Sequence, residues 1–234
     1  MMDTQKFELI MKDMKFLTLI IGLILLGCTH KKDSNNLAVQ QTGSVKTITT
    51  TNGKEEIKNL IRNVLIWSES KESIDLLPAL TDSKDSVYIG FDLKKHKENL
   101  DKLRKTGFFA KEFIENYNQI ILTLDKRLRN KEYDEWLVGD LPTFIFANDV
   151  DPWTLCQDVP YDNPSPWNLV EINELKLNDK NGEFEWKWGN LKPDIDSSWK
   201  QFFYRFNVIK ENNKCKISYL QGFDFKESTG QDGL

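Results

Sequence analysis

Histidine and cysteine are scarce in this chain, which has two histidines and three cysteines among 234 residues. Catalysis by a serine or cysteine nucleophile needs a base within hydrogen-bond reach. His30 lies in a polar segment and His96 on a charged, surface-facing helix, so neither is placed like such a base. The cysteines match no zinc-finger spacing, and no glycine-rich phosphate loop or G-x-S-x-G elbow is present. We therefore expect no catalytic residues, no metal and no cofactor.

An excess of positive charge is also missing, since 32 lysines and arginines face 36 aspartates and glutamates and the formal net charge is −4. A mildly acidic domain lacks the basic surface that nucleic acid attracts. Apart from one run near the amino terminus, no apolar stretch approaches the roughly 20 residues that a membrane-spanning helix needs. We expect no nucleic-acid partner and no spanning helix in the rest of the chain.

The one apolar run extends from Phe16 to Leu26 and follows Lys15. Its eleven or so residues are too few to cross a bilayer. A basic residue, a short apolar run and a small residue at the exit are typical of a cleavable export signal. A buried core helix is the alternative. Residues 1–13 carry acidic side chains that such a signal disfavours, so we predict that the true start is Met14, with Met11 as the second choice.

The run resembles a bacterial lipoprotein signal peptide ending in a lipobox, here Leu25-Leu26-Gly27-Cys28. The resemblance implies that residues 1–27 are removed, that the Cys28 thiol is diacylated and that the new amino terminus is acylated. Two or three acyl chains hold a protein stably on a membrane. Thr29 follows the cysteine where an aspartate would retain the protein in the inner membrane. This pattern predicts a lipid anchor in the cell envelope, at the outer membrane.

The segment after the cysteine is polar, and residues 28–55 are almost empty of large apolar side chains. Such a composition cannot bury enough apolar surface to offset the entropy of ordering. We predict a flexible tether over 28–55, a single domain over 56–225 and a disordered tail over 226–234.

Helical periodicity comes first in the domain. Apolar residues recur at i, i+3, i+4, i+7 and i+8 from Ile57 to Leu65, which predicts a helix over 54–68. A second helix is predicted over 92–104, ended by Gly107, and a third over 110–128.

Strand periodicity follows from Thr143 onward. Predicted strands cover 143–147, 170–177 with a β-bulge at Asn173-Glu174, 184–188, 199–209 and 215–220, with turns at 179–182 and 211–214. Consecutive hairpins make an antiparallel sheet. Helices followed by strands predict an α+β domain, in which amino-terminal helices pack on a curved antiparallel sheet in a cone-like arrangement.

Three short motifs suggest a family. The stretch Thr106–Phe109, the loop containing Asp151-Pro152-Trp153 and Gln157-Asp158, and the closing strand 214–220 resemble bacterial lipoproteins grouped as domain of unknown function 3828. That group resembles the nuclear-transport-factor-2-like (cystatin-like) fold. Cys215 stands where the group commonly carries tryptophan. The resemblance implies a cone-like fold and no particular activity.

The loop from Asn148 to Trp167 is rich in aspartate, proline and tryptophan, a composition found in ordered binding loops. A calcium site, a carboxylate pair for glycoside hydrolysis and a capped structural crossover are the three interpretations. Alternation places Phe184, Trp186 and Trp188 on one face, which forms either the core or an aromatic pocket. The candidate ligand-binding residues are Trp153, Gln157, Asp158, Trp167, Trp186 and Tyr204.

Two cysteines remain after lipidation, Cys156 and Cys215, and an oxidising compartment would allow them to pair. Two separate thiols are the alternative, because sequence does not show whether their Cα atoms lie within about 7 Å.

These observations predict a lipid-anchored, non-enzymatic domain that binds an envelope protein or a small molecule. A small hydrolase or isomerase using an aspartate of the 149–162 loop is one alternative. An envelope immunity or inhibitor protein is another.

Overall fold

The computed structural model describes residues 51–161 and 165–230, all of which belong to the compact unit Ser44–Leu234. The predicted signal peptide over 1–27, Cys28 and the tether up to residue 50 lie outside the described residues. Within the described ranges, no helix is both long and apolar enough to cross a membrane.

The three predicted helices are confirmed as α1 (Thr51–Ser68), α2 (Leu93–Thr106) and α3 (Lys111–Arg129). The Asp92 side chain accepts hydrogen bonds from the first backbone N–H groups of α2, and Gly107 ends that helix in the left-handed conformation that glycine adopts without strain. Because α1 begins at Thr51, the predicted tether is wrong over residues 51–55.

The carboxyl-terminal boundary of the domain also differs from the predicted one. Residues predicted as a disordered tail form α5 (Phe225–Thr229), which Asp224 caps and Gly230 ends. Ser228 and Thr229 are buried. The tail prediction is therefore wrong over residues 226–230, while residues 231–234 lie outside the described part. The polar composition of this segment hid a helix that tertiary contacts with α3 stabilise.

The predicted antiparallel sheet is confirmed, with four strands in the order β3-β4-β5-β6. They are β3 (Val170–Leu177), β4 (Asn181–Trp188), β5 (Tyr204–Glu211) and β6 (Lys214–Leu220). The register shift in β3 falls between Glu174 and Lys176, one residue beyond the predicted bulge. Phe184, Trp186 and Trp188 share the buried face, as the alternation predicts.

Two strand predictions are wrong. Residues 143–147 form no strand, because their alternation arises from Phe144 and Phe146 packing into separate aromatic contacts around an exposed Ile145. Residues 197–201 form the short helix α4, which Asp196 caps, so β5 begins at Tyr204. A two-stranded hairpin of β1 (Ala79–Thr81) and β2 (Tyr88–Phe91) was not predicted.

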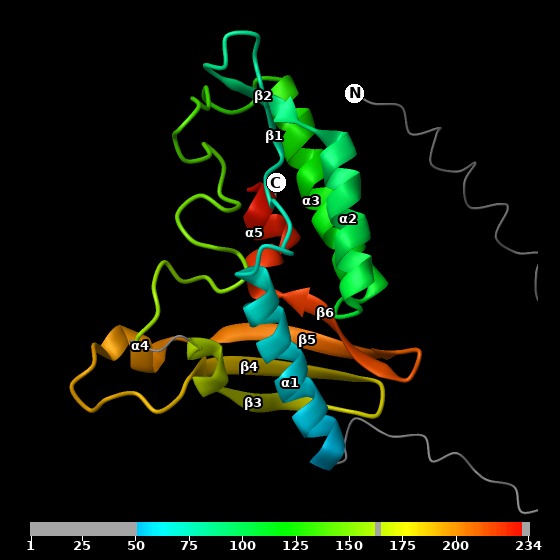
Figure 1. The fold of residues 1–234 in the computed structure, drawn as a ribbon, viewed down its shortest axis with the longest axis vertical. Helices are drawn as coiled ribbons and strands as arrows, with labels where there is room; N and C mark the ends of the chain where they lie inside the picture. Colours follow the sequence, from blue (N-terminus) through cyan, green and yellow to red (C-terminus); the bar gives the residue numbers. More distant parts are fainter. Residues whose placement is uncertain (1–50, 162–164, 231–234) are drawn as a thin grey trace, which may run out of the picture. The chain divides into compact units, whose positions relative to one another are not determined.

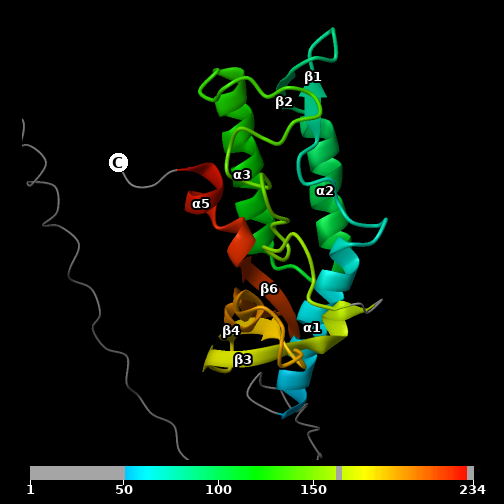
Figure 2. The same cartoon turned by 90° about the vertical axis from the view of Figure 1, so that its left-hand side faces the viewer.

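The α+β class is confirmed, but the three long helices do not all pack on the sheet. Helix α1 crosses the sheet and contacts both β6 and the 3-10 turn η1 (Pro166–Leu169) that leads into β3 (Figure 1). Helices α2 and α3 lie side by side beyond β6, and the β1–β2 hairpin lies at their far end (Figures 1 and 2). Phe109, between α2 and α3, forms an isolated bridge to Ile217 of β6. Only α1 therefore lies across the sheet.

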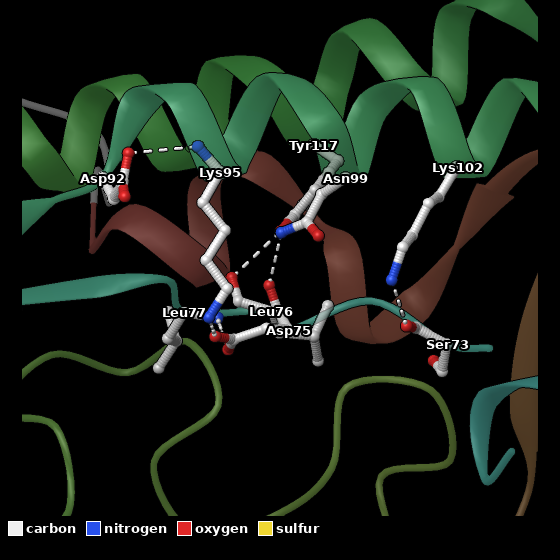
Figure 3. Close-up of polar contacts among 9 residues, drawn as sticks. All are labelled: Ser73, Asp75, Leu76, Leu77, Asp92, Lys95, Asn99, Lys102 and Tyr117. Carbon is white, nitrogen blue, oxygen red and sulfur yellow. Dashed lines mark hydrogen bonds and ion pairs between the residues drawn. The ribbon is translucent and has the colours of Figure 1, made fainter. Parts of the chain in front are cut away.

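The connector after α1 is held against the α2–α3 pair by polar contacts (Figure 3). The Asn99 side chain donates to the Asp75 carbonyl at 2.7 Å, and the Tyr117 hydroxyl donates to the Leu76 carbonyl at 3.0 Å. The Lys95 ammonium pairs with the Asp75 carboxylate at 2.6 Å. These bonds satisfy carbonyls that a non-helical segment would otherwise leave unpaired.

His96 is buried between α2 and α3, with 3% of its surface exposed, so the expected surface position is wrong. Its Nε2 lies 3.0 Å from Asn118 Oδ1, and its ring meets Tyr117 edge to face. Burial lowers the pKa of the imidazole below its usual value, and the hydrogen bond to Asn118 opposes this only in part. His96 is therefore held as the neutral form.

We expect acid to destabilise the fold through His96. A folded-state pKa below the unfolded value of about 6.5 means that the unfolded chain binds the proton more readily, so stability falls as pH falls below that value. In urea titrations at pH 7.5 and 5.0, the wild type should lose more free energy of unfolding than His96→Gln, which keeps a hydrogen-bonding amide and cannot titrate. Equal losses in the two proteins would show that His96 does not contribute.

Candidate functional site

Four of the six candidate ligand-binding residues are part of the packed core. Trp153, Trp167, Trp186 and Tyr204 each expose 3% of their surface or less. Trp186 stacks on Tyr204 with ring centroids 5.6 Å apart and meets Trp167 edge to face. These contacts bury large apolar surfaces in geometries that aromatic pairs favour. The core interpretation of this aromatic face is confirmed.

The indole nitrogens of Trp167, Trp186 and Trp188 are buried without a hydrogen-bond partner. Their rings lie 5.1 to 6.3 Å apart, and Trp186 meets both of the others edge to face. Edge-to-face contacts are a favourable arrangement of aromatic rings. The cluster is accounted for as core packing.

Tyr204 joins the predicted loop to the sheet. Its buried hydroxyl donates to the Pro152 carbonyl at 2.9 Å and accepts from the Gly222 N–H at 3.1 Å. Trp153, the next residue of the loop, packs on Phe113 and Phe223. The amino-terminal part of the loop is thus fixed by one buried hydroxyl and one buried indole, as expected for a structural crossover.

Tyr204→Phe should lower the free energy of unfolding by about 2 kcal/mol, because it leaves a buried carbonyl and a backbone N–H unpaired. Tyr88→Phe is the matched control, since no hydrogen bond of the Tyr88 hydroxyl occurs among the described residues. Urea titration followed by tryptophan fluorescence measures both. Equal stability of the two variants would contradict the bridging role of Tyr204.

The polar candidates lie apart from the aromatic ones. Gln157 and Asp158 are exposed, and each bonds within the loop: Gln157 Nε2 donates to the Asp149 carbonyl, and the Val159 N–H donates to Asp158. Across the described part of the chain, no group of three or more histidine, cysteine, aspartate or glutamate side chains could hold a metal ion.

Asp151 is a loop carboxyl with an altered acidity. Although the residue reaches the surface, surrounding atoms displace water from its carboxylate and raise its pKa, while the hydrogen bond from the Trp153 N–H opposes the shift and the charge of Glu69 adds to it. A catalytic carboxyl would also need a cavity. Neither the large groove described below nor the two smaller hollows of about 270 and 360 Å³ includes Asp151.

The two remaining cysteines are free thiols, so the disulfide alternative is not formed in this structure. Loss of solvation is the main cause that raises the pKa of Cys156 to about 12 and that of Cys215 to about 11. A thiol is nucleophilic only as the thiolate, so both are inert near neutral pH. Cys215 lies on β6, where its backbone N–H donates to Glu56 of α1.

A groove of about 860 Å³ lies between α1 and β3, and we call it the α1–β3 groove. Lys54, Lys58 and Arg62 line it from α1. The facing wall includes Ile172 and Glu174 of β3 together with Phe184 of β4. Sequence reasoning missed this site, although the i, i+4, i+8 spacing of the three basic residues could have indicated a charged helix face.

β3 is an edge strand, so no described strand pairs with its outer side. The Leu169 carbonyl accepts from Gly189, which follows β4, whereas the Val170 carbonyl points the other way and accepts from Arg62 at 2.9 Å. Since these directions alternate along a strand, the backbone groups of Ile172 and Glu174 also point outward. Within the described residues, no strand pairs with them.

Two ion pairs lie in the groove, one close and one at the limit of contact. Lys54 Nζ lies 2.8 Å from the Glu174 carboxylate, and Lys58 Nζ lies 4.0 Å from Glu55, with these four side chains 36% to 64% exposed. Exposed pairs of this kind contribute little to stability, about 0.5 kcal/mol each. The groove therefore presents cations of α1 on one wall and outward backbone groups of β3 on the other.

No family model, curated protein or solved structure matches the chain. The resemblance to the domain of unknown function 3828 group therefore rests on its three short motifs.

Proposed function

We propose that this protein is a bacterial envelope lipoprotein, anchored through Cys28 at the outer membrane, whose domain binds another protein and catalyses no reaction. The observation that carries the proposal is the free outer edge of β3 beside the α1–β3 groove. An unpaired strand edge is a template for another chain unless it is covered or charged. An open groove with polar walls suits a polypeptide better than a small apolar ligand, which needs an enclosed apolar pocket.

The other functions are less well supported. The enzyme alternative has a carboxyl of raised pKa in Asp151, but that residue lines no described hollow. The small-molecule alternative relied on aromatic residues that pack in the core. An immunity or inhibitor protein is a special case of the present proposal, because it also acts by binding a protein. We also propose that the helices and the curved sheet together have a cone-like arrangement.

Site-specific photo-crosslinking in bacterial cells tests this function. A photoreactive amino acid in place of Lys58 lies in the groove, and one in place of Lys97, an exposed residue of α2, is the matched control. We expect a discrete adduct of higher mass from position 58 and none from position 97. Adducts from neither position, or equally from both, would contradict a binding site at this groove.

A further inference from the structure

The outer edge of β3 has a candidate occupant in the chain itself. We infer that residues 44–50, which directly precede α1, add to this edge as a short parallel strand, and that a partner has to displace them. Docking of the segment stands on its own observations, whereas the competition with a partner rests on the proposed function.

The position of α1 determines the direction of such a strand. Lys54, in the first turn of α1, lies 2.8 Å from Glu174, and Arg62 of the same helix donates to the Val170 carbonyl. Helix α1 therefore begins near the Glu174 end of β3. A segment that follows β3 and ends at Thr51 has to arrive at that same end, so it runs parallel to β3.

The segment is long enough to follow the edge. Residues 44–50, when extended, span roughly 23 Å, whereas the edge from Val170 to Glu174 covers roughly 13 Å. About three residues therefore remain to join the added strand to α1, which packs against β6 and η1. Residues 44–47 are then the ones that pair with β3.

The composition of the segment favours a strand. Residues 44–50 read Ser-Val-Lys-Thr-Ile-Thr-Thr, so five of the seven are β-branched. Such residues are enriched in strands, because the branched side chain fits the pleated surface. Residues 29–43, the rest of the predicted tether before this segment, contain only three β-branched residues, at positions 29, 39 and 42. The strand propensity is therefore concentrated in the part of the tether next to α1.

Charge in the groove selects neither an acidic nor a basic occupant. The lining contains three carboxylates and three cations, which are Glu55, Glu171, Glu174, Lys54, Lys58 and Arg62. The segment matches this balance, since Lys46 is its only charged residue. Its advantage over other chains is covalent attachment, because a short linker gives an effective concentration in about the millimolar range.

The number of available hydrogen bonds makes docking reversible. Among the outward groups, those of Ile172 and Glu174 precede the register shift between Glu174 and Lys176, and the Val170 carbonyl already accepts from Arg62. Few bonds therefore hold the segment on β3. A partner whose strand also contacts the α1 wall of the groove can displace it.

Hydrogen exchange of single amides tests docking. The protein, purified in detergent, is compared with a variant in which a Gly/Ser sequence of equal length replaces residues 44–50. We expect the outward N–H groups of Ile172 and Glu174 to exchange about tenfold more slowly in the wild type, because they are exposed only when the segment is undocked. The N–H of Asn173, which points to β4, is the internal control. Equal rates in the two proteins would overturn the inference.

Two neighbouring proline variants test whether the segment pairs as a strand. Adjacent N–H groups of a strand point to opposite sides, so only one of Lys46→Pro and Thr47→Pro removes a donor that faces β3. We expect one variant to abolish the slow exchange of Ile172 and Glu174 and the other to retain it. Val39→Pro, outside the segment, is the matched control and should retain it. Loss in both variants, or in neither, would contradict strand pairing.

Crosslinking in cells tests the competition. With the photoreactive amino acid at position 58, the Gly/Ser replacement should increase the yield of the adduct about tenfold if the edge is free about a tenth of the time in the wild type. An unchanged yield would overturn the competition. Absence of an adduct from both proteins would contradict the proposed function, and the exchange rates would still decide whether the segment docks.

Discussion

Replacing Cys28 with alanine should move the protein from the membrane fraction to the soluble fraction of cells and abolish labelling by a palmitate analogue. The sulfur of the thiol is the atom that would receive the lipid in the predicted lipobox, and the printed sequence contains no second apolar run of similar length. Each buried methylene of an acyl chain contributes about 0.8 kcal/mol to membrane binding, so losing two or three chains changes partitioning by many orders of magnitude.

Cys156→Ala is the matched control, because it removes a thiol that lies outside the lipobox and carries no predicted lipid. It should keep both membrane attachment and label. If Cys28→Ala stayed membrane-bound at the mass of the unprocessed chain, the uncleaved apolar run would be the anchor. If it was cleaved and stayed membrane-bound, the protein would have another membrane contact.

Gly222→Ala should lower the free energy of unfolding by about 3 kcal/mol. A Cβ at this position would lie 2.0 Å from the Pro152 carbonyl oxygen. That carbonyl accepts the Tyr204 hydroxyl, and the Gly222 N–H donates to the same hydroxyl. The added methyl group would push two backbones apart where they are hydrogen-bonded through one side chain, so neither backbone can move without losing a bond.

Gly107→Ala is the control, because glycine is favoured there by the backbone conformation and not by lack of space. No atom lies within 4 Å of the Cβ position there, and the cost arises only from the left-handed φ of 72°. We expect a loss of about 1 kcal/mol. A urea titration of the two variants compares steric exclusion with backbone strain. A smaller effect at Gly222 than at Gly107 would contradict the close approach of the loop to the sheet.

The helices and strands that depend on residues close together in the sequence were predictable. The first helix was recognised from its apolar repeat and the end of α2 from Gly107, because a helix buries one face and ends where the backbone turns. The alternation of Phe184, Trp186 and Trp188 indicated one buried face for the same reason. Capping by Asp224 was just as local, yet the polar tail around it concealed α5.

Features that depend on contacts between residues far apart in the sequence were not predictable. Alternation at 143–147 predicts a strand, but Phe144 and Phe146 make separate aromatic contacts in the core, and no described strand pairs with the segment. The burial of His96 arises from α3, whose Asn118 and Tyr117 meet it across the helix pair. Short-range patterns do not show which of two faces of a charged helix is covered.

The sequence by itself determined α1, α2 and α3, the hairpin order of β3 to β6 and the aromatic face of the sheet, because each depends on residues close together in the chain. The lipid anchor stays a prediction from the sequence. The residues of the candidate site come together only in the tertiary structure. Lys58 and Glu174 are distant in sequence and come together only because α1 crosses the sheet at its β3 edge. Whether an edge strand is free depends on what packs beside it, and that is decided by the packing of all elements together.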